Sequence, residues 1–324
     1  MSENPLTRWP ILTPRGAPDE AALRGIRELA AAAAEADANP PLSEQTLVDL
    51  RSPDADPDLL RVYSTLALDE HSDPSTAQYL AGVAVLNSPP GDQEAGVLEL
   101  VVHPNYRNQG VGTALAQAVQ ADTGRGVKAW SHGNHEAAVE LAARFGYRPV
   151  RELWRMRLSH DALEKELPAP ALPEGVVLRR FEPGRDETAW LQANAAAFAH
   201  HPEQGAMTRA DLEARMAEDW FDPAGFLLAV RESDGELLGF HWTKVHPRSG
   251  SHPAMGEVYV VGVTPQAQGS GLGKALTLAG IEHLRQAGLR AVMLYVDADN
   301  APAVALYRRL GFVRWDVDVM YAAE

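Results

Sequence analysis

The sequence predicts an α/β protein built from two tandem copies of one domain, each with a mixed α+β sheet. In both copies an apolar strand ends at a proline and is followed by a glycine-rich loop and a helix, at residues 98–115 and 256–284. Three pairs of residues lie 161 positions apart: Pro104 and Pro265, Gly110 and Gly271, Gly112 and Gly273. Gly146 and Gly311 lie 165 positions apart, a shift of four residues that two copies of one domain explain. A chain of 324 residues is also natural for two domains of ordinary size.

The first half of the chain predicts alternating helices and strands. Residues 19–36 form an amphipathic pattern with Asp19 and Glu20 at the positive end of the helix. Ser43 is predicted to cap a second helix over residues 44–50. The later elements of this half are strands at 60–68 and 78–86 joined by a polar turn at 69–76, a strand at 98–102, a helix to about 122, a strand at 127–131, a helix beginning at Asn134 and a strand at 147–158.

Residues 159–175 are predicted to form a linker, because closely spaced prolines favour an extended spacer. We therefore expect domains at residues 1–158 and 176–324. The second domain is predicted to contain a strand at 176–180, a helix at 186–199, a loop at 200–205, a helix capped by Thr208 and Asp211, a hairpin of 226–231 and 237–245, a strand at 256–263, a helix from about 275, a strand at 292–296, a helix at 301–310 capped by Asn300 and a closing strand at 315–321.

The loop after the strand 256–263 suits phosphate binding, because it offers backbone N–H groups and the positive end of a helix. A Walker loop is excluded, since Gln268 and Ala275 occupy positions that need glycine and Ser/Thr. A dinucleotide fingerprint is excluded, since Lys274 replaces its third glycine. The pattern Gln/Arg-x-x-Gly-x-Gly fits at two places: Gln268, Gly271 and Gly273, and Arg107, Gly110 and Gly112. An ordinary tight turn is the alternative interpretation.

This pattern resembles the pyrophosphate loop of the GNAT acetyltransferases. The resemblance implies that acetyl-CoA is the cosubstrate, that it lies across the splayed ends of two strands, and that an amine attacks its thioester directly. The chain contains no cysteine, so the usual acyl-enzyme nucleophile is missing, which agrees with direct attack. The implied acetyl-CoA contacts are Val261, Gly262, Val263, Gln268, Gly269, Ser270, Gly271, Leu272, Gly273, Lys274, Asn300, Ala301, Pro302, Ala303, Val304 and Ala305 in the second half, and Leu100, Val101, Val102, Asn108, Gln109, Gly110, Val111, Gly112 and Thr113 in the first.

Two side chains of the second half occupy family positions for proton transfer. Glu257, at the mouth of the motif strand, is expected to be the general base for the amine; an exposed charge at a strand end is the alternative. Tyr307 lies seven residues after Asn300, where family members often place a tyrosine that protonates the CoA thiolate; a core tyrosine is the alternative. At the aligned positions the first half has Gly96 and Ala142. We therefore expect a catalytic second domain and a first domain that binds acetyl-CoA or CoA structurally, although nearby Glu99 offers another base.

A closer resemblance covers the whole chain and concerns one tandem-domain branch of the family from actinobacteria. It is carried by the tandem arrangement and by residues 200–205, 239–246, 256–263 and 294–300. That branch acetylates the cysteinyl amine of a cysteine–glucosamine–inositol conjugate. The resemblance implies substrate contacts from Glu44, Glu203, Lys244, Glu257 and Tyr295. The alternatives are an acetyltransferase for another amine, such as an aminoglycoside, a polyamine or a protein N-terminus, and a non-enzymatic acyl-CoA-binding module.

Composition excludes several other classes of function. A formal charge of −15 argues against nucleic acid as a partner, and the absence of cysteine excludes disulfides and thiolate metal sites. Five histidines have spacings that fit no compact metal site: His200, His201, His241, His246 and His252. The sequence has no signal-like N-terminus and no apolar run of membrane-spanning length. We expect a cytoplasmic monomer without a metal or membrane partner.

Overall fold

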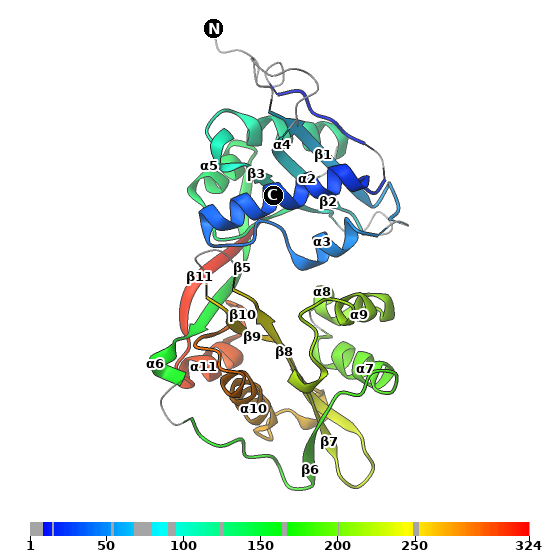
Figure 1. Cartoon of the computed structure of the whole chain (residues 1–324), viewed down its shortest axis with the longest axis vertical. Helices are drawn as coiled ribbons and strands as arrows, with labels where there is room; N and C mark the ends of the chain where they lie inside the picture. The colour runs from blue at the N-terminus through cyan, green and yellow to red at the C-terminus, as the bar shows by residue number, and fades with distance from the viewer. Residues whose placement is uncertain are drawn as a thin grey trace. The chain divides into compact units, whose positions relative to one another are not determined.

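The computed structural model describes residues 9–14, 16–52, 55–67, 79–89, 95–123, 126–163, 167–199, 201–248 and 253–323. The chain divides into two compact units (Figure 1). Unit 1 comprises Met1–Leu153 and Val317–Glu324, and unit 2 comprises Trp154–Asp316. Two strands, β5 (Tyr147–Leu158) and β11 (Val313–Ala323), each run from one unit into the other.

Unit 1 is a mixed sheet in the order β1-β2-β3-β4-β11. Its pairs are antiparallel except for β3 and β4, which are parallel. The strands that lie wholly in unit 1 are β1 (Leu60–Leu66), β2 (Leu80–Asn87), β3 (Val97–Val102) and β4 (Lys128–Ser131). The helices are α2 (Glu20–Asp37), α3 (Glu44–Asp49), η1 (Pro104–Tyr106), α4 (Val111–Thr123) and α5 (Glu136–Arg144).

The core of unit 1 has two layers because side chains alternate along its strands. On β2, Ala84 and Leu86 pack in the same cluster as Val111 and Leu115 of α4. Val83 and Val85 point to the opposite face and pack in the cluster that contains three apolar residues of α2: Ile26, Leu29 and Ala33. Helix α4 therefore covers one face of the sheet and α2 covers the other.

Unit 2 repeats this plan in the order β6-β7-β8-β9-β10-β5, with β9 and β10 parallel. Its strands are β6 (Val176–Arg180), β7 (Phe226–Arg231), β8 (Leu237–His246), β9 (Met255–Val263) and β10 (Val292–Asp297). The helices are α6 (His160–Leu163), α7 (Glu187–Ala197), α8 (Pro202–Gly205), α9 (Arg209–Met216), η2 (Pro223–Gly225), η3 (Pro265–Ala267), α10 (Leu272–Gln286) and α11 (Ala301–Arg309).

An aromatic cluster fills one face of the unit 2 sheet. Trp242 of β8 stacks on Phe226 of β7 with ring centroids 4.5 Å apart. Trp190 of α7 meets both rings edge to face, a geometry that aromatic pairs favour. On the other face an aliphatic cluster joins α10 and α11 to the sheet through Ile281 and Val304. The central strands are thus buried on both sides.

The predicted helix caps are confirmed where side chains act locally. The side chain of Asp19 accepts a hydrogen bond from the backbone N–H of Ala22 at the start of α2. Ser43 caps α3 by accepting from Thr46 N–H. Thr208 and Asp211 form a reciprocal capping box on α9.

Two local predictions were wrong, and one lies outside the described residues. The loop expected at 200–205 contains the single helical turn α8. The helix expected to begin at Asn134 begins at Glu136, because Asn134 has a left-handed backbone (φ 43°) and its side chain accepts a hydrogen bond from Tyr321. The polar turn predicted at 69–76 is not described.

The last residues of each sequence repeat belong to the compact unit formed mainly by the other repeat. Residues 315–321 were expected to close the sheet of the second repeat, but β11 pairs with β4 in unit 1, where Tyr321 lies opposite Ala129. Trp154–Leu158, from the first repeat, belongs to unit 2. The domain boundaries at 158 and 176 therefore remain a prediction about the sequence repeats. The division into compact units depends on which strands pair with one another, and local sequence patterns do not predict the pairing of strands that are far apart in the chain.

Candidate functional site

Strands β9 and β10 part from each other along their length. Three pairs of residues form the register between them: Val292 with Gly256, Met293 with Glu257 and Leu294 with Val258. Both strands then continue, to Val263 and Asp297, with no further partners in that register. On its other edge β9 stays paired, since Val261, Gly262 and Val263 lie opposite residues of β8. The edge of β9 turned toward β10 therefore offers backbone N–H and C=O groups that the sheet does not use.

A bulge in β9 lies where the strands part. The register between β8 and β9 shifts so that Trp242 faces Val260 while Thr243 faces Val258, which leaves Tyr259 as the extra residue. Bulges bend a strand and redirect its side chains. The Tyr259 ring lies 5.0 Å from that of Trp220, and its hydroxyl accepts a hydrogen bond from Arg215 at 2.9 Å.

The glycine loop leads directly into α10. Gly269 and Gly271 both have left-handed backbones, with φ of 77° and 84°, which glycine adopts without strain. Gly271 is the residue before the helix and has no side chain to cap it, while Ser270 Oγ accepts a long hydrogen bond of 3.4 Å from Leu272 N–H. The first N–H groups of α10 and its positive end are therefore suited to an anion. The Lys274 side chain in the first turn is exposed.

The segment 300–305 forms the start of α11. The Asn300 side chain accepts a hydrogen bond from Ala303 N–H at 3.2 Å, and Pro302 stands in the first turn, where it needs no hydrogen bond. The capping predicted for Asn300 is thus confirmed. Val304 turns inward and is buried.

Glu257 is buried rather than exposed at a strand end. Only 5 % of the residue is accessible, so the interpretation as an exposed surface charge was wrong. Its Oε2 atom lies 2.5 Å from Nε2 of His246, and Lys244 is its cross-strand partner. Glu257 is therefore a buried carboxyl in contact with the imidazole of His246.

Tyr307 points into the core of unit 2 from α11. It is 6 % accessible, and burial raises its pKa to about 12. Its ring lies 5.7 Å from that of Phe312. No side chain or backbone group of the described residues forms a hydrogen bond with its hydroxyl. The phenol is therefore neutral at ordinary pH and has a donor to offer.

The residues expected at the amine substrate lie in different parts of the chain. The Lys244 ammonium lies 4.4 Å from the Trp220 ring centroid and 5.2 Å from that of Tyr259, so two aromatic faces hold it. Tyr295 is half-buried on β10. Glu203 lies in α8, and its side chain is outside the described atoms. Glu44 lies in the first turn of α3, in unit 1.

The histidines considered as metal ligands lie at separate places. His201 pairs with Asp297 at 3.3 Å, and His246 with Glu257. His241 is fully buried, donates from Nδ1 to the carbonyl of Leu276, and has its pKa lowered to about 4 by burial. His200 and His252 are outside the described residues.

Unit 1 repeats the parting strands with a different loop environment. Strands β3 and β4 pair only from Val97 to Glu99, while Leu100, Val101 and Val102 stay paired with β2. The segment 108–113 begins with two left-handed residues, Asn108 (φ 60°) and Gly110 (φ 89°), and enters α4. The carbonyl of Gln109 accepts a hydrogen bond from Trp9, and the Arg107 guanidinium makes two 2.7 Å bonds to Asp37. Hydrogen bonds with Trp9 and Asp37 thus stabilise this loop.

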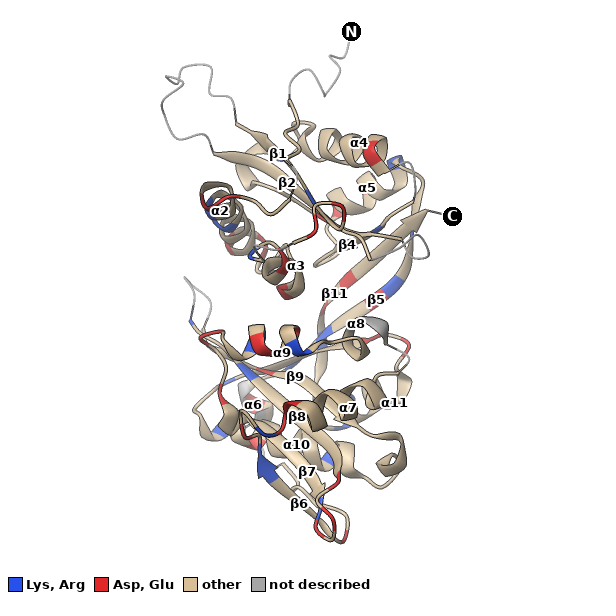
Figure 2. Ribbon diagram, turned by 90° about the vertical axis from the view of Figure 1, so that its right-hand side faces the viewer, with Lys and Arg blue, Asp and Glu red and all other residues tan. Residues whose placement is uncertain are grey.

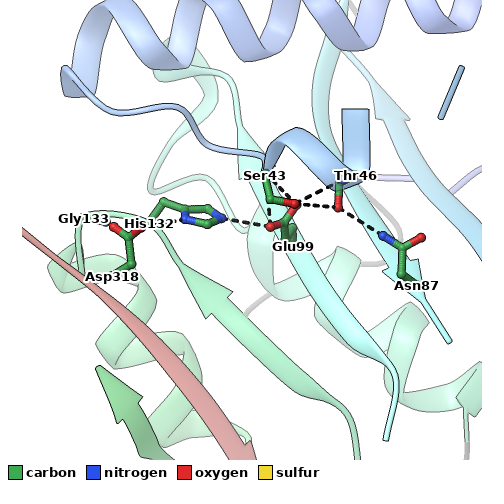
Figure 3. A network of polar contacts seen from close by, with 7 residues as sticks. All are labelled: Ser43, Thr46, Asn87, Glu99, His132, Gly133 and Asp318. Atoms are coloured by element: carbon green, nitrogen blue, oxygen red, sulfur yellow. Dashed lines mark hydrogen bonds and ion pairs between the residues drawn. The ribbon is translucent and has the colours of Figure 1, made fainter. Parts of the chain in front are cut away.

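A buried network surrounds Glu99 (Figure 3). Both oxygens of Glu99 accept from Ser43 N–H, at 3.1 and 3.0 Å, and Oε1 lies 2.9 Å from Nε2 of His132. The other ring nitrogen of His132 lies 3.1 Å from Asp318, which also accepts from Gly133 N–H. Burial, the largest influence, opposes ionisation of both partners. The hydrogen bonds and opposite charges nevertheless raise the pKa of His132 to about 10 and lower that of Glu99.

Sequence reasoning missed the partners that these side chains find. His246 was treated as an ordinary strand residue, although it contacts the predicted base. Trp220, which lies over the Lys244 ammonium, belongs to no motif. One local signal was available: Lys244 and His246 are two residues apart and so share a face of their strand. The sequence does not show which residue of the neighbouring strand lies opposite each of them.

Charged residues are distributed over both units. Figure 2 shows acidic and basic positions interspersed along the helices and strands. The described part of the chain contains no helix that combines the length and the apolar character needed to span a membrane.

Comparison with known families identifies the type of both halves. Residues 189–312 match the model of the acetyltransferase (GNAT) family, and residues 71–149 match that of an acetyltransferase (GNAT) domain. Among solved structures, the tandem GNAT protein from the clavulanic acid biosynthesis pathway is 22 % identical with a TM-score of 0.69 and covers 97 % of this chain and 98 % of its own. A GCN5-related N-acetyltransferase from Sphaerobacter thermophilus is 28 % identical with a TM-score of 0.63, covering 97 % and 95 %. The predicted fold class is confirmed.

Curated relatives match the whole chain at higher identity. The mycothiol acetyltransferase of Paenarthrobacter aurescens (strain TC1) is 66 % identical over 322 residues, covering 99 % of this chain and 98 % of its own. That of Pseudarthrobacter chlorophenolicus is 64 % identical over 315 residues, covering 97 % and 96 %. The similarity thus extends across both repeats.

Proposed function

The chain belongs to the mycothiol acetyltransferase family, and on that premise we propose that it transfers the acetyl group of acetyl-CoA to the cysteinyl amine of a cysteine–glucosamine–inositol conjugate, giving mycothiol. It is an acetyltransferase with two GNAT domains. The observation that carries the proposal is the parting of β9 and β10 after Val258, the residue that follows Glu257. A thioester held between those strands has a buried carboxylate at the closed end of the opening.

Acetyl-CoA binds through backbone groups in this proposal. The amides of its pantetheine arm pair with the unused edge of β9 at Val261, Gly262 and Val263, as a further strand would. Its diphosphate lies on residues 268–274, where the N–H groups at the start of α10 face the anion. Residues 300–305 at the start of α11 line the opposite side. Glycine at 262 also keeps β9 close to its neighbour, since a Cβ there would lie 2.6 Å from the Phe240 ring.

The reaction removes two protons from the amine nitrogen and releases a thiolate. Glu257 takes the first proton from the substrate ammonium, which frees the nitrogen lone pair for attack on the thioester carbonyl carbon. The nitrogen of the tetrahedral intermediate loses its second proton to solvent as the C–S bond breaks, and sulfur leaves as a thiolate. Tyr307 donates a hydrogen bond from its hydroxyl to that sulfur. Because its pKa is about 12 and a thiol has a pKa of about 8.5, a hydrogen bond to the thiolate is favoured over full transfer.

Charged and aromatic side chains recognise the acceptor. Lys244 donates to hydroxyls of the sugar or inositol, with its ammonium held in place by Trp220 and Tyr259. Glu203 and Glu257 attract the cationic amine, and Tyr295 adds a polar contact. The net charge of −15 also favours a cationic substrate over an anionic one.

The first domain binds acetyl-CoA or CoA without transferring it. Glycine and alanine stand at the positions aligned with Glu257 and Tyr307: Gly96 and Ala142. The remaining candidate base, Glu99, is held as a carboxylate by Ser43 and His132, which lower its pKa and occupy its oxygens. An acid of that kind is a poor proton acceptor.

Mass spectrometry of the products tests the proposal. The purified chain is incubated with acetyl-CoA and, separately, with the cysteinyl conjugate, the same glycoside without cysteine, a polyamine and an aminoglycoside. We expect one acetyl group on the cysteinyl conjugate alone, with its thiol still free to alkylation. Acetylation of a different amine would replace the substrate assignment, and binding of acetyl-CoA without transfer to any amine would favour a binding module.

A further inference from the structure

We infer that His246 is a positioning residue for Glu257: it donates Nε2–H to Oε2 and aims the other carboxylate oxygen at the amine. This inference deepens the proposed function and depends on Glu257 acting as the base. The contact that carries it is the 2.5 Å separation of the two atoms.

The two side chains meet because of the register between β8 and β9. Lys244 lies directly opposite Glu257, and His246 lies opposite Met255 two residues further along each strand. Residues two apart on a strand share a face, so His246 is the diagonal neighbour of Glu257 on the face that carries Lys244. Such neighbours are within reach of a long side chain.

The proposed role of Glu257 identifies the donor. A carboxylate that accepts a proton as a base is ionised and has no hydrogen of its own, so the hydrogen between the two atoms, which lie 2.5 Å apart, belongs to His246. His246 therefore donates from Nε2, either as the imidazolium or as the neutral tautomer with its hydrogen on Nε2. The histidine side chain is 38 % accessible while that of Glu257 is 7 % accessible, so solvent reaches the pair from the histidine side.

The contact with His246 uses only one carboxylate oxygen of Glu257. Among the described residues only His246 forms a hydrogen bond with this side chain, so Oε1 has no donor among them. The charged or titratable neighbours on β8 are Lys244 and His246, while β10 presents the apolar Met293 opposite Glu257 and α10 packs Leu284 against Gly256. Of these neighbours, His246 is the one within hydrogen-bond distance of the carboxylate.

Removing His246 should therefore lower kcat and leave the KM of acetyl-CoA unchanged, because the carboxylate loses the donor that orients it. We expect kcat of His246→Ala to fall about tenfold or more. His246→Gln keeps an N–H donor and should retain most of the parent rate. Added imidazole should restore part of the His246→Ala rate.

His283→Gln is the matched control, because His283 belongs to the same unit and faces a different carboxylate, Asp222, at 3.8 Å. Its kcat and both KM values should match those of the parent chain. A purely structural role for His246 would lower the melting temperature and raise the KM of acetyl-CoA as well, without rescue by glutamine or imidazole. An unchanged kcat in His246→Ala would overturn the inference.

Nuclear magnetic resonance of ¹⁵N-histidine-labelled protein without substrate tests the pairing independently of activity. We expect the His246 signal to show a hydrogen on Nε2, and the Nε2 chemical shift to change in Glu257→Gln, which replaces the acceptor. An unchanged chemical shift in Glu257→Gln would contradict the pairing. If the pairing is present and the cysteinyl conjugate is not acetylated, the substrate assignment fails instead, and the His246 kinetics are measured on whichever amine the parent chain acetylates.

Discussion

His132 and Asp318, which are 186 positions apart, meet through a 3.1 Å contact between Nδ1 and Oδ2 inside unit 1. The contact links β11, the last strand of the chain, to the residue that follows β4. His132 has its pKa raised to about 10, well above the value near 6.5 expected in an unfolded chain. The stability that it contributes is therefore fully present below about pH 6.5 and is lost as pH rises toward 10.

We predict that His132→Gln destabilises unit 1 by about 3–5 kcal/mol, because two buried carboxylates lose their charged partner. Urea unfolding between pH 6 and 10 checks this. The parent chain should lose stability across that range, and the variant should show a flatter dependence. Equal slopes in both proteins would mean that the histidine does not carry the charge assigned to it.

Glu257→Gln should lower kcat by about 10²-fold, with the larger loss at low pH where the amine is protonated. Its folding should be intact, since glutamine can still accept a hydrogen bond from His246. Glu282→Gln, at a partly exposed glutamate of α10, is the control and should leave kcat unchanged. A Glu257→Gln profile parallel to that of the parent would remove Glu257 from its role as base.

Gly271→Ala should weaken acetyl-CoA binding several-fold. The backbone at 271 has φ 84° and nothing lies within 4 Å of a Cβ placed there, so the effect is conformational rather than steric. Gly288→Ala is a matched control, because its φ is 80° with equally open space, beyond the other end of α10. Both variants should lose about 1–2 kcal/mol of stability. Calorimetry with CoA should separate them, and equal affinity in the two would contradict a phosphate role for the loop.

Trp220→Leu should raise the KM of the amine several-fold and leave that of acetyl-CoA unchanged. The Lys244 ammonium loses one aromatic face, worth about 0.5–2 kcal/mol. Trp154→Leu removes an aromatic face from Arg308 and Arg314 and serves as the control. Steady-state kinetics with each substrate varied in turn measures both KM values. A change confined to the KM of acetyl-CoA would count against Lys244 as an acceptor contact.

Tyr307→Phe should lower kcat about tenfold or more without loss of stability. No described residue bonds to the hydroxyl, so its removal leaves no protein partner unsatisfied. Thermal unfolding and single-turnover kinetics test the two parts separately. A phenylalanine variant with full kcat would leave Tyr307 as a core aromatic only.

Local chemistry explains which features could be predicted. The caps at Ser43, Thr208 and Asn300 depend on residues three positions away, and each was predicted correctly. The strand–proline–glycine–helix unit is equally local, and its repetition predicted the tandem fold. The roles of the site residues came from family resemblance and stay predictions.

Side chains that meet across strands could not be predicted in the same way. The bulge at Tyr259 shifts the register between β8 and β9, and that shift decides which β8 residues face Glu257. Without the register, His246 is one polar residue among many. A one-residue slip would turn every side chain of the strand to the other face.

By itself the sequence determined the two repeats, the glycine loops and the helix caps, because each depends on residues close together in the chain. Only the tertiary structure decided that the final strand joins the first unit, that His132 bridges Glu99 and Asp318, and that His246 contacts the buried Glu257. Those relationships depend on strand register and on burial. Both are set when the whole chain packs.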